Sequence, residues 1–183
     1  MHTSTCEFER GLVTEGRIRL FSLYVDYAAA ERARWVTSQI ARLVGEHWKT
    51  STEMWNLDSL ATTSEPIRKM ISQEATDADV LIVALSSLDR RELELVQWLN
   101  SLTASKSKSP VPRLFISLLG DEKHPAGELE WTVEQFLRCA QRMNQDFIWR
   151  WMEPEAMADG DWLADSVAAL LNRKQHAWDM TFW

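Results

Sequence analysis

The chain has 183 residues, of which 45% are hydrophobic and 26% are charged. These are the proportions of an ordinary globular domain, and they exclude a disordered or low-complexity chain. Acidic residues outnumber basic residues by 27 to 20, which gives a formal net charge of -7. This deficit of cations argues against nucleic acid as a partner and against docking on an anionic membrane surface.

Five apolar runs alternate with five amphipathic patterns along the chain. The runs are short and mostly rich in β-branched or aromatic residues, which predicts strands, and the patterns repeat every three or four residues, which predicts helices. In chain order, the predicted strands span residues 18–25, 48–57, 80–85, 113–119 and 146–152. The predicted helices span residues 28–44, 64–78, 89–102, 128–144 and 161–174.

This alternation predicts parallel strands joined by right-handed crossovers, with helices on both faces of the sheet. For five strands in a chain of this length, we expect a three-layer, doubly wound α/β fold with the flavodoxin-like strand order 2-1-3-4-5. Residues 49–54 and 146–152 are expected to form the two edge strands. The chain divides into an N-terminal extension (1–16), a single domain (17–175) and an aromatic C-terminal tail (176–183).

The ligand crevice of such a sheet lies beyond the carboxyl ends of its strands, at the point where the winding reverses. Asp26 and Tyr27 follow the first predicted strand, and Ser86 and Ser87 follow the third. Asp58 follows the second predicted strand. These five residues are therefore our candidates for the lining of a ligand crevice.

Three of these residues have alternative roles. As a carboxylate in the crevice, Asp26 either binds Mg²⁺ or acts as an acid or base. Alternatively, it caps the helix that follows it. Ser86 and Ser87 either donate hydroxyl groups to an anion or form a turn before a helix that Asp89 caps. The first loop contains no glycine, and the chain has neither a dinucleotide fingerprint nor a phosphate loop. This argues against a classical nucleotide site.

The remaining chemistry-bearing residues form no recognisable set. Cys6 and Cys139 are far apart and have no histidine beside them, so they predict neither a zinc site nor a redox pair and fit a reducing cytoplasm. The four histidines have no partner at metal-ligand spacing. The first ten residues include acidic residues where a signal peptide would be apolar. We therefore expect a cytoplasmic protein with no metal and no cofactor.

Ten tryptophans are the one unusual count in the composition. Trp149 and Trp151 alternate along the last predicted strand, and Trp162 lies in the last predicted helix. Tryptophan brings a large contact area at low entropic cost, so these three are candidates for an interface with a protein partner or a second copy. The alternative is that the aromatic tail at 176–183 folds back and covers the domain's own sheet edge.

Residues 17–152 resemble small uncharacterised bacterial proteins that look like stand-alone receiver or flavodoxin-like domains. The resemblance lies in LYVD at 23–26, STEMW at 51–55 and ADVLIV at 78–83. Receiver domains of response regulators carry a phosphoacceptor Asp at the end of the third strand, where this chain has Ser86 and Ser87. Arg150 stands where those domains have a lysine on the last strand. The resemblance therefore implies a non-catalytic signalling or protein-interaction module.

A weaker likeness is to TIR domains. It rests on ADVLIVALSS at residues 78–87 and on Asp58 after the second strand. In that family a glutamate on the next helix supports the cleavage of NAD, and Glu92 or Glu94 would take this role here, with Asp26 as a further candidate. The alternative function is therefore an enzyme that acts on NAD or another nucleotide.

Overall fold

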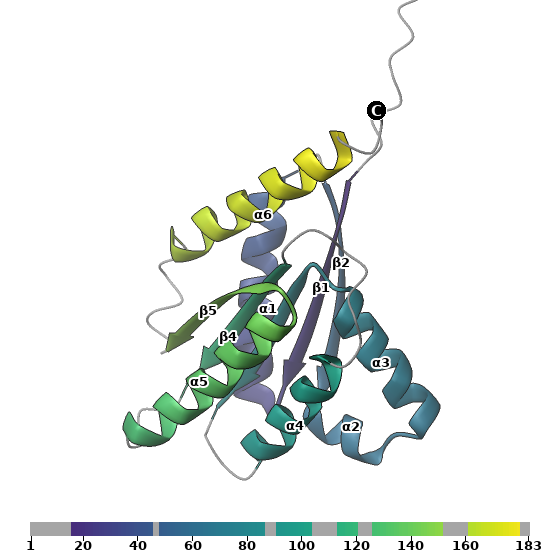
Figure 1. The fold of residues 1–183 in the computed structure, drawn as a ribbon, viewed down its shortest axis with the longest axis vertical. Helices are drawn as coiled ribbons and strands as arrows, with labels where there is room; N and C mark the ends of the chain where they lie inside the picture. The colour runs from purple at the N-terminus through teal and green to yellow at the C-terminus, as the bar shows by residue number, and fades with distance from the viewer. Residues whose placement is uncertain are drawn as a thin grey trace, which may run out of the picture.

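A parallel sheet of five strands forms the centre of the molecule (Figure 1). The computed structural model describes residues 16–45, 48–86, 91–103, 113–120, 126–151 and 161–179. The strands are β1 (Gly16–Tyr24), β2 (Trp48–Asn56), β3 (Val80–Leu85), β4 (Arg113–Leu119) and β5 (Gln145–Trp151). Their order is β2-β1-β3-β4-β5 and all four pairings are parallel, which confirms the predicted topology.

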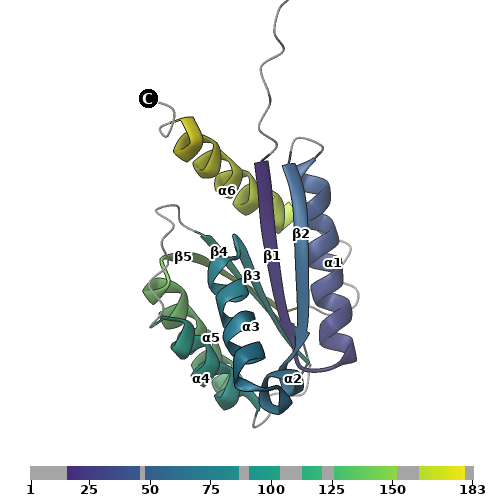
Figure 2. The ribbon, with the colours of Figure 1, turned by 90° about the vertical axis from the view of Figure 1, so that its right-hand side faces the viewer.

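Helices cover both faces of the sheet, so the predicted three layers are confirmed (Figure 2). One face carries α1 (Tyr27–Val44) and α6 (Asp161–Asp179), which pack against each other. The other face carries α3 (Glu65–Asp77), α4 (Arg91–Thr103) and α5 (Ala126–Arg142). Within the described ranges, no helix is both long and apolar enough to span a bilayer.

Burial along the strands follows their place in the sheet. Strands β3 and β4 are buried at every residue, as strands covered on both faces must be. Strands β2 and β5 are partly exposed along their lengths, and both lie at sheet edges as predicted. The core between the layers is closed by large side chains such as Phe21, Phe115 and Phe136.

Several element limits differ from the prediction. A short helix, α2 (Leu57–Thr62), begins where the prediction ends the second strand, because the Asn56 side chain accepts the Asp58 amide at 2.7 Å and caps a helix. Helix α5 ends two residues early because Asn144 has a φ of 54°, a left-handed turn that Asn tolerates.

The last helix is longer than predicted. No glycine or proline interrupts residues 161–179, so α6 continues five residues beyond Lys174. The first four residues of the predicted aromatic tail, 176–179, are therefore helical. Residues 180–183 lie outside the described residues. At the other end of the domain, β1 already begins at Gly16.

Asp79, which directly precedes β3, joins four elements at the amino ends of the strands. Its Oδ2 accepts the Arg19 amide of β1 at 2.8 Å, and its carbonyl accepts the Leu114 amide of β4 at 3.0 Å. Its Oδ1 pairs at 2.7 Å with Nζ of Lys174 in α6. The two side chains are only 8% and 15% exposed, so this ion pair is largely withdrawn from water.

The electrostatics of this cluster follow from its burial. Burial lowers the pKa of Lys174 from its ordinary value, and the Asp79 carboxylate offsets part of that effect. Burial also lowers the pKa of Arg113, which lies in the same neighbourhood. The Asp79 carboxylate therefore favours the charged form of both side chains.

We expect Asp79→Asn to lower the free energy of unfolding by about 3–5 kcal/mol, because it leaves the buried Lys174 amine without a counter-ion. The matched control is Lys69→Met, which breaks the exposed pair that Lys69 makes with Glu65 at 2.7 Å. That change should cost less than about 1 kcal/mol. Urea unfolding followed by circular dichroism measures both variants, and equal losses would contradict the role given to Asp79.

Candidate functional site

The predicted crevice is built around Asp26, which lies between β1 and α1. Its Oδ1 accepts the Ala29 amide at 2.9 Å, so Asp26 is the N-cap of α1, the second of its two predicted roles. The same oxygen accepts a hydrogen bond from Oγ of Ser86 at 2.5 Å. Ser86 directly follows β3, and this contact joins the carboxyl ends of β1 and β3, which are neighbours in the sheet.

Arg32, in the second turn of α1, completes the network. Its Nη2 donates to the Leu85 carbonyl at 2.9 Å and to Oγ of Ser86 at 3.0 Å. The guanidinium also lies against Gly120 at the end of β4, where an added Cβ would stand 2.7 Å from its Cζ. The sequence analysis missed Arg32, since its side chain reaches this site only through the packing of α1 across the strand ends.

These contacts determine what the network can do chemically. A serine hydroxyl has one proton to donate, and Ser86 gives it to Asp26 while accepting from Arg32. Ser86 therefore has no proton left for an anion. The amides at the start of α1 face the carboxylate of Asp26, which repels a second anion from the helix N-terminus. The network is therefore suited to joining the strand ends to α1 and not to binding a phosphate.

The described hydrogen bonds of this network include neither Tyr27 nor Asp58. Tyr27 is 78% exposed at the start of α1. Asp58 is exposed in the first turn of α2, next to Asn56, whose Nδ2 donates to the Val25 carbonyl at 3.4 Å. Ser87, like the predicted cap Asp89, lies outside the described residues. Of the five candidates, the described contacts bring Asp26 and Ser86 together.

The predicted catalytic glutamates lie in the first turn of α4. Glu94 is exposed, and Glu92 is partly buried. The described contacts join neither of them to Asp26 or Ser86. In the described residues, no group of three or more His, Cys, Asp or Glu side chains is arranged to hold a metal ion.

Burial separates the tryptophans into two groups. Six of those described pack against the hydrophobic core: Trp35, Trp48, Trp55, Trp98, Trp151 and Trp162. Two are among the exposed large side chains, Trp149 at 39% and Trp131 at 44%. Trp162 contacts Arg150, whose side chain alternates with those of Trp149 and Trp151 along β5. Of the three interface candidates, Trp149 is therefore the one that faces solvent, and Trp162 lies on the opposite face of the sheet.

The strand order 2-1-3-4-5, with helices on both faces, defines a flavodoxin-like α/β protein. In fold the chain is similar to a solved short-chain flavodoxin associated with a non-canonical PDU bacterial microcompartment. The match covers 83% of this chain and 97% of that chain, with a TM-score of 0.51 and 14% identity. No protein-family model matches the sequence, and the search of curated proteins gives no match. The likeness therefore concerns the fold alone.

We expect Ser86→Ala and Asp26→Ala each to lower the free energy of unfolding by about 1–2 kcal/mol, because each removes hydrogen bonds of the network. The double variant should lose about 0.5 kcal/mol less than the sum of the two, since the side chains are in contact. Urea unfolding of the four proteins in this cycle measures the coupling. Ser38→Ala, which removes an exposed hydroxyl of α1, is the control. Strictly additive losses would contradict the network.

Proposed function

We propose that this protein is a non-catalytic signalling or interaction module with a receiver-like, flavodoxin-like fold. The observation that carries this proposal is the network of Asp26, Ser86 and Arg32, which uses the polar groups at the crevice for bonds to one another. A fold by itself carries no function, and chemistry would need reactive groups held toward a ligand. Here the polar groups at the carboxyl ends of β1 and β3 bond to each other and to α1 instead.

The arrangement does not fit a flavin mononucleotide, the cofactor that the flavodoxin-like fold holds at the switch point between β1 and β3. A phosphate at that point needs the amides of a helix N-terminus. In this chain the Asp26 carboxylate accepts the Ala29 amide at that terminus. Its negative charge opposes a phosphate there, so we derive no flavin chemistry for the protein.

Phosphotransfer of the receiver type also lacks support at the described positions. The residue after β3 is Ser86, where a receiver would have its phosphoacceptor carboxylate. On β5, the Arg150 guanidinium lies 5.5 Å from the centre of the Trp162 ring, a cation–π contact that engages it against α6. These features favour the interaction module over an enzyme that acts on NAD or another nucleotide.

We expect the full chain to be chemically inert toward the small molecules that the alternatives require. With acetyl phosphate and Mg²⁺, mass spectrometry should find no added phosphoryl group, and with NAD, chromatography should find no released nicotinamide. Flavin mononucleotide should raise the melting temperature by less than about 2 °C, because a ligand that does not bind does not stabilise. Stoichiometric phosphorylation, or steady release of nicotinamide, would overturn the proposal.

The contact surface of the module is expected at the β5 edge. Trp149 offers a large apolar side chain to solvent there, and among the described strands β5 pairs with β4 alone, so its outer edge has no described strand partner. We expect a second copy of the chain to cover this surface, with Trp149 at the centre of the interface. Trp151 and Trp162 would pack behind it against the hydrophobic core. Aromatic anchors of this kind dominate many interfaces.

Light scattering at increasing protein concentration tests the surface. The wild-type chain should form a dimer, and Trp149→Ser should shift the equilibrium toward monomer by about tenfold or more, as the loss of an anchor residue does. Trp131→Ser, on the exposed side of α5, is the matched control and should leave the dimer unchanged. A wild-type monomer at every concentration would contradict self-association.

A further inference from the structure

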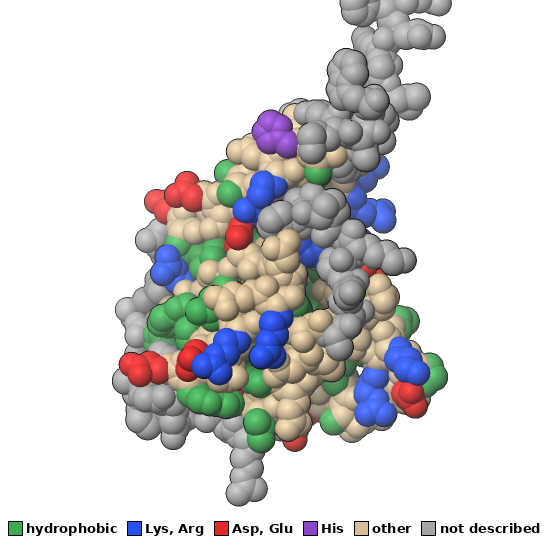
Figure 3. Space-filling view, in the orientation of Figure 1, with side chains coloured by type: hydrophobic (Ala, Val, Ile, Leu, Met, Phe, Trp, Pro, Cys, Tyr) green, Lys and Arg blue, Asp and Glu red, His purple; other side chains and the backbone are tan. Residues whose placement is uncertain are grey.

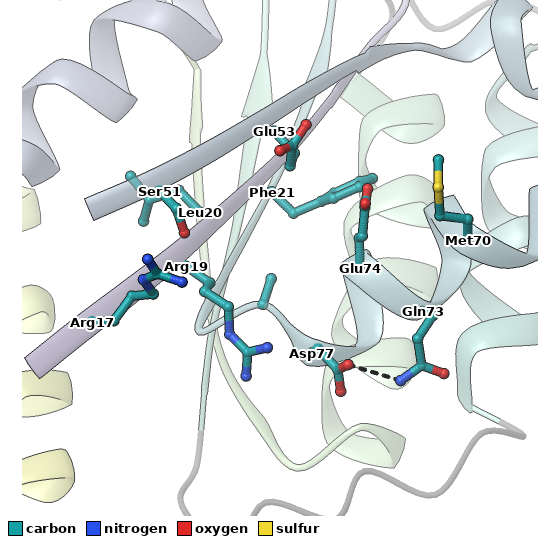
Figure 4. Close-up of a pocket in the computed structure, with 11 residues that line it drawn as sticks. Arg17, Arg19, Leu20, Phe21, Ser51, Glu53, Met70, Gln73, Glu74 and Asp77 are labelled. Atoms are coloured by element: carbon teal, nitrogen blue, oxygen red, sulfur yellow. Dashed lines mark hydrogen bonds between the residues drawn. The ribbon is translucent and has the colours of Figure 1, made fainter. Parts of the chain in front are cut away.

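A groove lies at the opposite edge of the sheet from Trp149. It has a volume of about 410 Å³ and lies between α3 and the adjoining face of β1 and β2 (Figure 4). Its volume is in the range of small-molecule sites. Its lining belongs to the described part of the chain, and the residues that would contact a ligand are Arg17, Arg19, Phe21, Glu53, Met70 and Glu74.

The groove exists because the sheet edge is incompletely covered. Along β1, Arg17 and Arg19 are exposed, whereas Phe21, two residues further on the same face, is buried. The Phe21 ring stacks on Trp98 of α4, with ring centres 6.2 Å apart. The apolar floor therefore ends at Phe21, and from there to the amino end of β1 charged side chains line the hollow.

One end of the groove is cationic. Arg17 and Arg19 extend from the amino half of β1, and Ser51 lies beside them on β2 (Figure 4). Arg19 is near enough to the buried cations Lys174 and Arg113 to lower the pKa of both. Of the ionisable side chains that line this end of the groove, Arg17 and Arg19 are cationic and Asp77 is anionic. The positive excess favours an anionic group at this end.

The other end is anionic. Glu53 is the strand partner of Phe21 on β2, and Glu74 extends from α3 toward the same space (Figure 4). Oε2 of Glu74 is shielded from solvent and has no hydrogen-bond partner. Burying an unpaired carboxylate oxygen costs free energy, and a cationic group bound in the groove beside the same carboxylate would offset part of that cost. Within the described residues, no ion pair joins Glu53 or Glu74 to Arg17 or Arg19 across the groove.

We propose that this groove binds a small zwitterionic molecule. Its acidic group would pair with Arg17 and Arg19, its protonated amine or guanidine would pair with Glu53 and Glu74, and its apolar middle would lie against Phe21 and Met70. Opposite charges at the two ends discriminate against ligands with a single charge, because such a ligand leaves one end unpaired. This proposal does not rest on the interaction role, since the groove and Trp149 lie at opposite edges of the sheet.

Isothermal titration calorimetry of the full chain with a series of ω-amino acids tests the proposal. The series is glycine, β-alanine, γ-aminobutyrate, δ-aminovalerate and ε-aminocaproate, which differ in the separation of the two charges. At least one member should bind with a Kd below about 1 mM. Caproate and hexylamine, which each carry one of the two charges, should bind about tenfold more weakly than the best member. No binding by any member, or equal binding of the singly charged compounds, would overturn the proposal.

Two variants locate the site. Glu74→Gln keeps the shape of the side chain and removes its charge, and Arg19→Gln weakens the cationic end. Each should reduce the affinity for the best ω-amino acid by about tenfold, which is the expected effect of losing one partly buried charge pair. Glu130→Gln, at an exposed position of α5, is the matched control and should bind like the wild type. Circular dichroism melting confirms that the variants are folded, and unchanged affinity in both site variants would place the binding elsewhere and refute the proposal.

Discussion

The buried carboxylate of Asp79 fixes how the elements of this protein meet. It holds β1 through the Arg19 amide, and α6 through Lys174, while the backbone of the same residue continues the ladders to β1 and β4. A buried ion pair contributes little net stability compared with apolar residues of the same volume. Its effect is on specificity, because any other docking of α6 would leave Asp79 or Lys174 charged and unpaired. We infer that the pair selects the position of α6, while the buried side chains of Leu163, Val167 and Leu170 attach the helix to the sheet.

The polar and charged groups at the two ends of the sheet are paired in different ways. At the amino ends of the strands, several cations gather around few carboxylates, and the excess charge reaches the surface through Arg17 and Arg19. At the carboxyl ends, the polar groups of Asp26, Ser86 and Arg32 satisfy one another. The fold would usually place its ligand at the second end, whereas the arginines that line the groove lie at the first.

The sequence predicted the features that depend on local patterns. The apolar runs of β3 and β4 predicted central strands, the mixed polarity of β2 predicted an edge strand, and Asp26 before a helical pattern predicted a cap. Contacts between residues that are far apart in the sequence could not be predicted. Nothing around Arg32 indicates that its guanidinium bonds to Leu85, 53 positions away. The groove could not be predicted either, because it depends on how much of the face of β1 and β2 is covered by α3.

Gly120 has a consequence for how this protein could change. The absence of a side chain leaves room for the Arg32 guanidinium, which sits where the first carbon of any other residue would be. A single methyl group at this position must displace that guanidinium, which would free an acceptor lone pair of Ser86 and leave the Leu85 carbonyl with the Gly120 amide as its donor. One nucleotide change in the glycine codon would therefore rearrange the donors and acceptors at the carboxyl ends of the strands, which is where a fold of this class usually places its ligand.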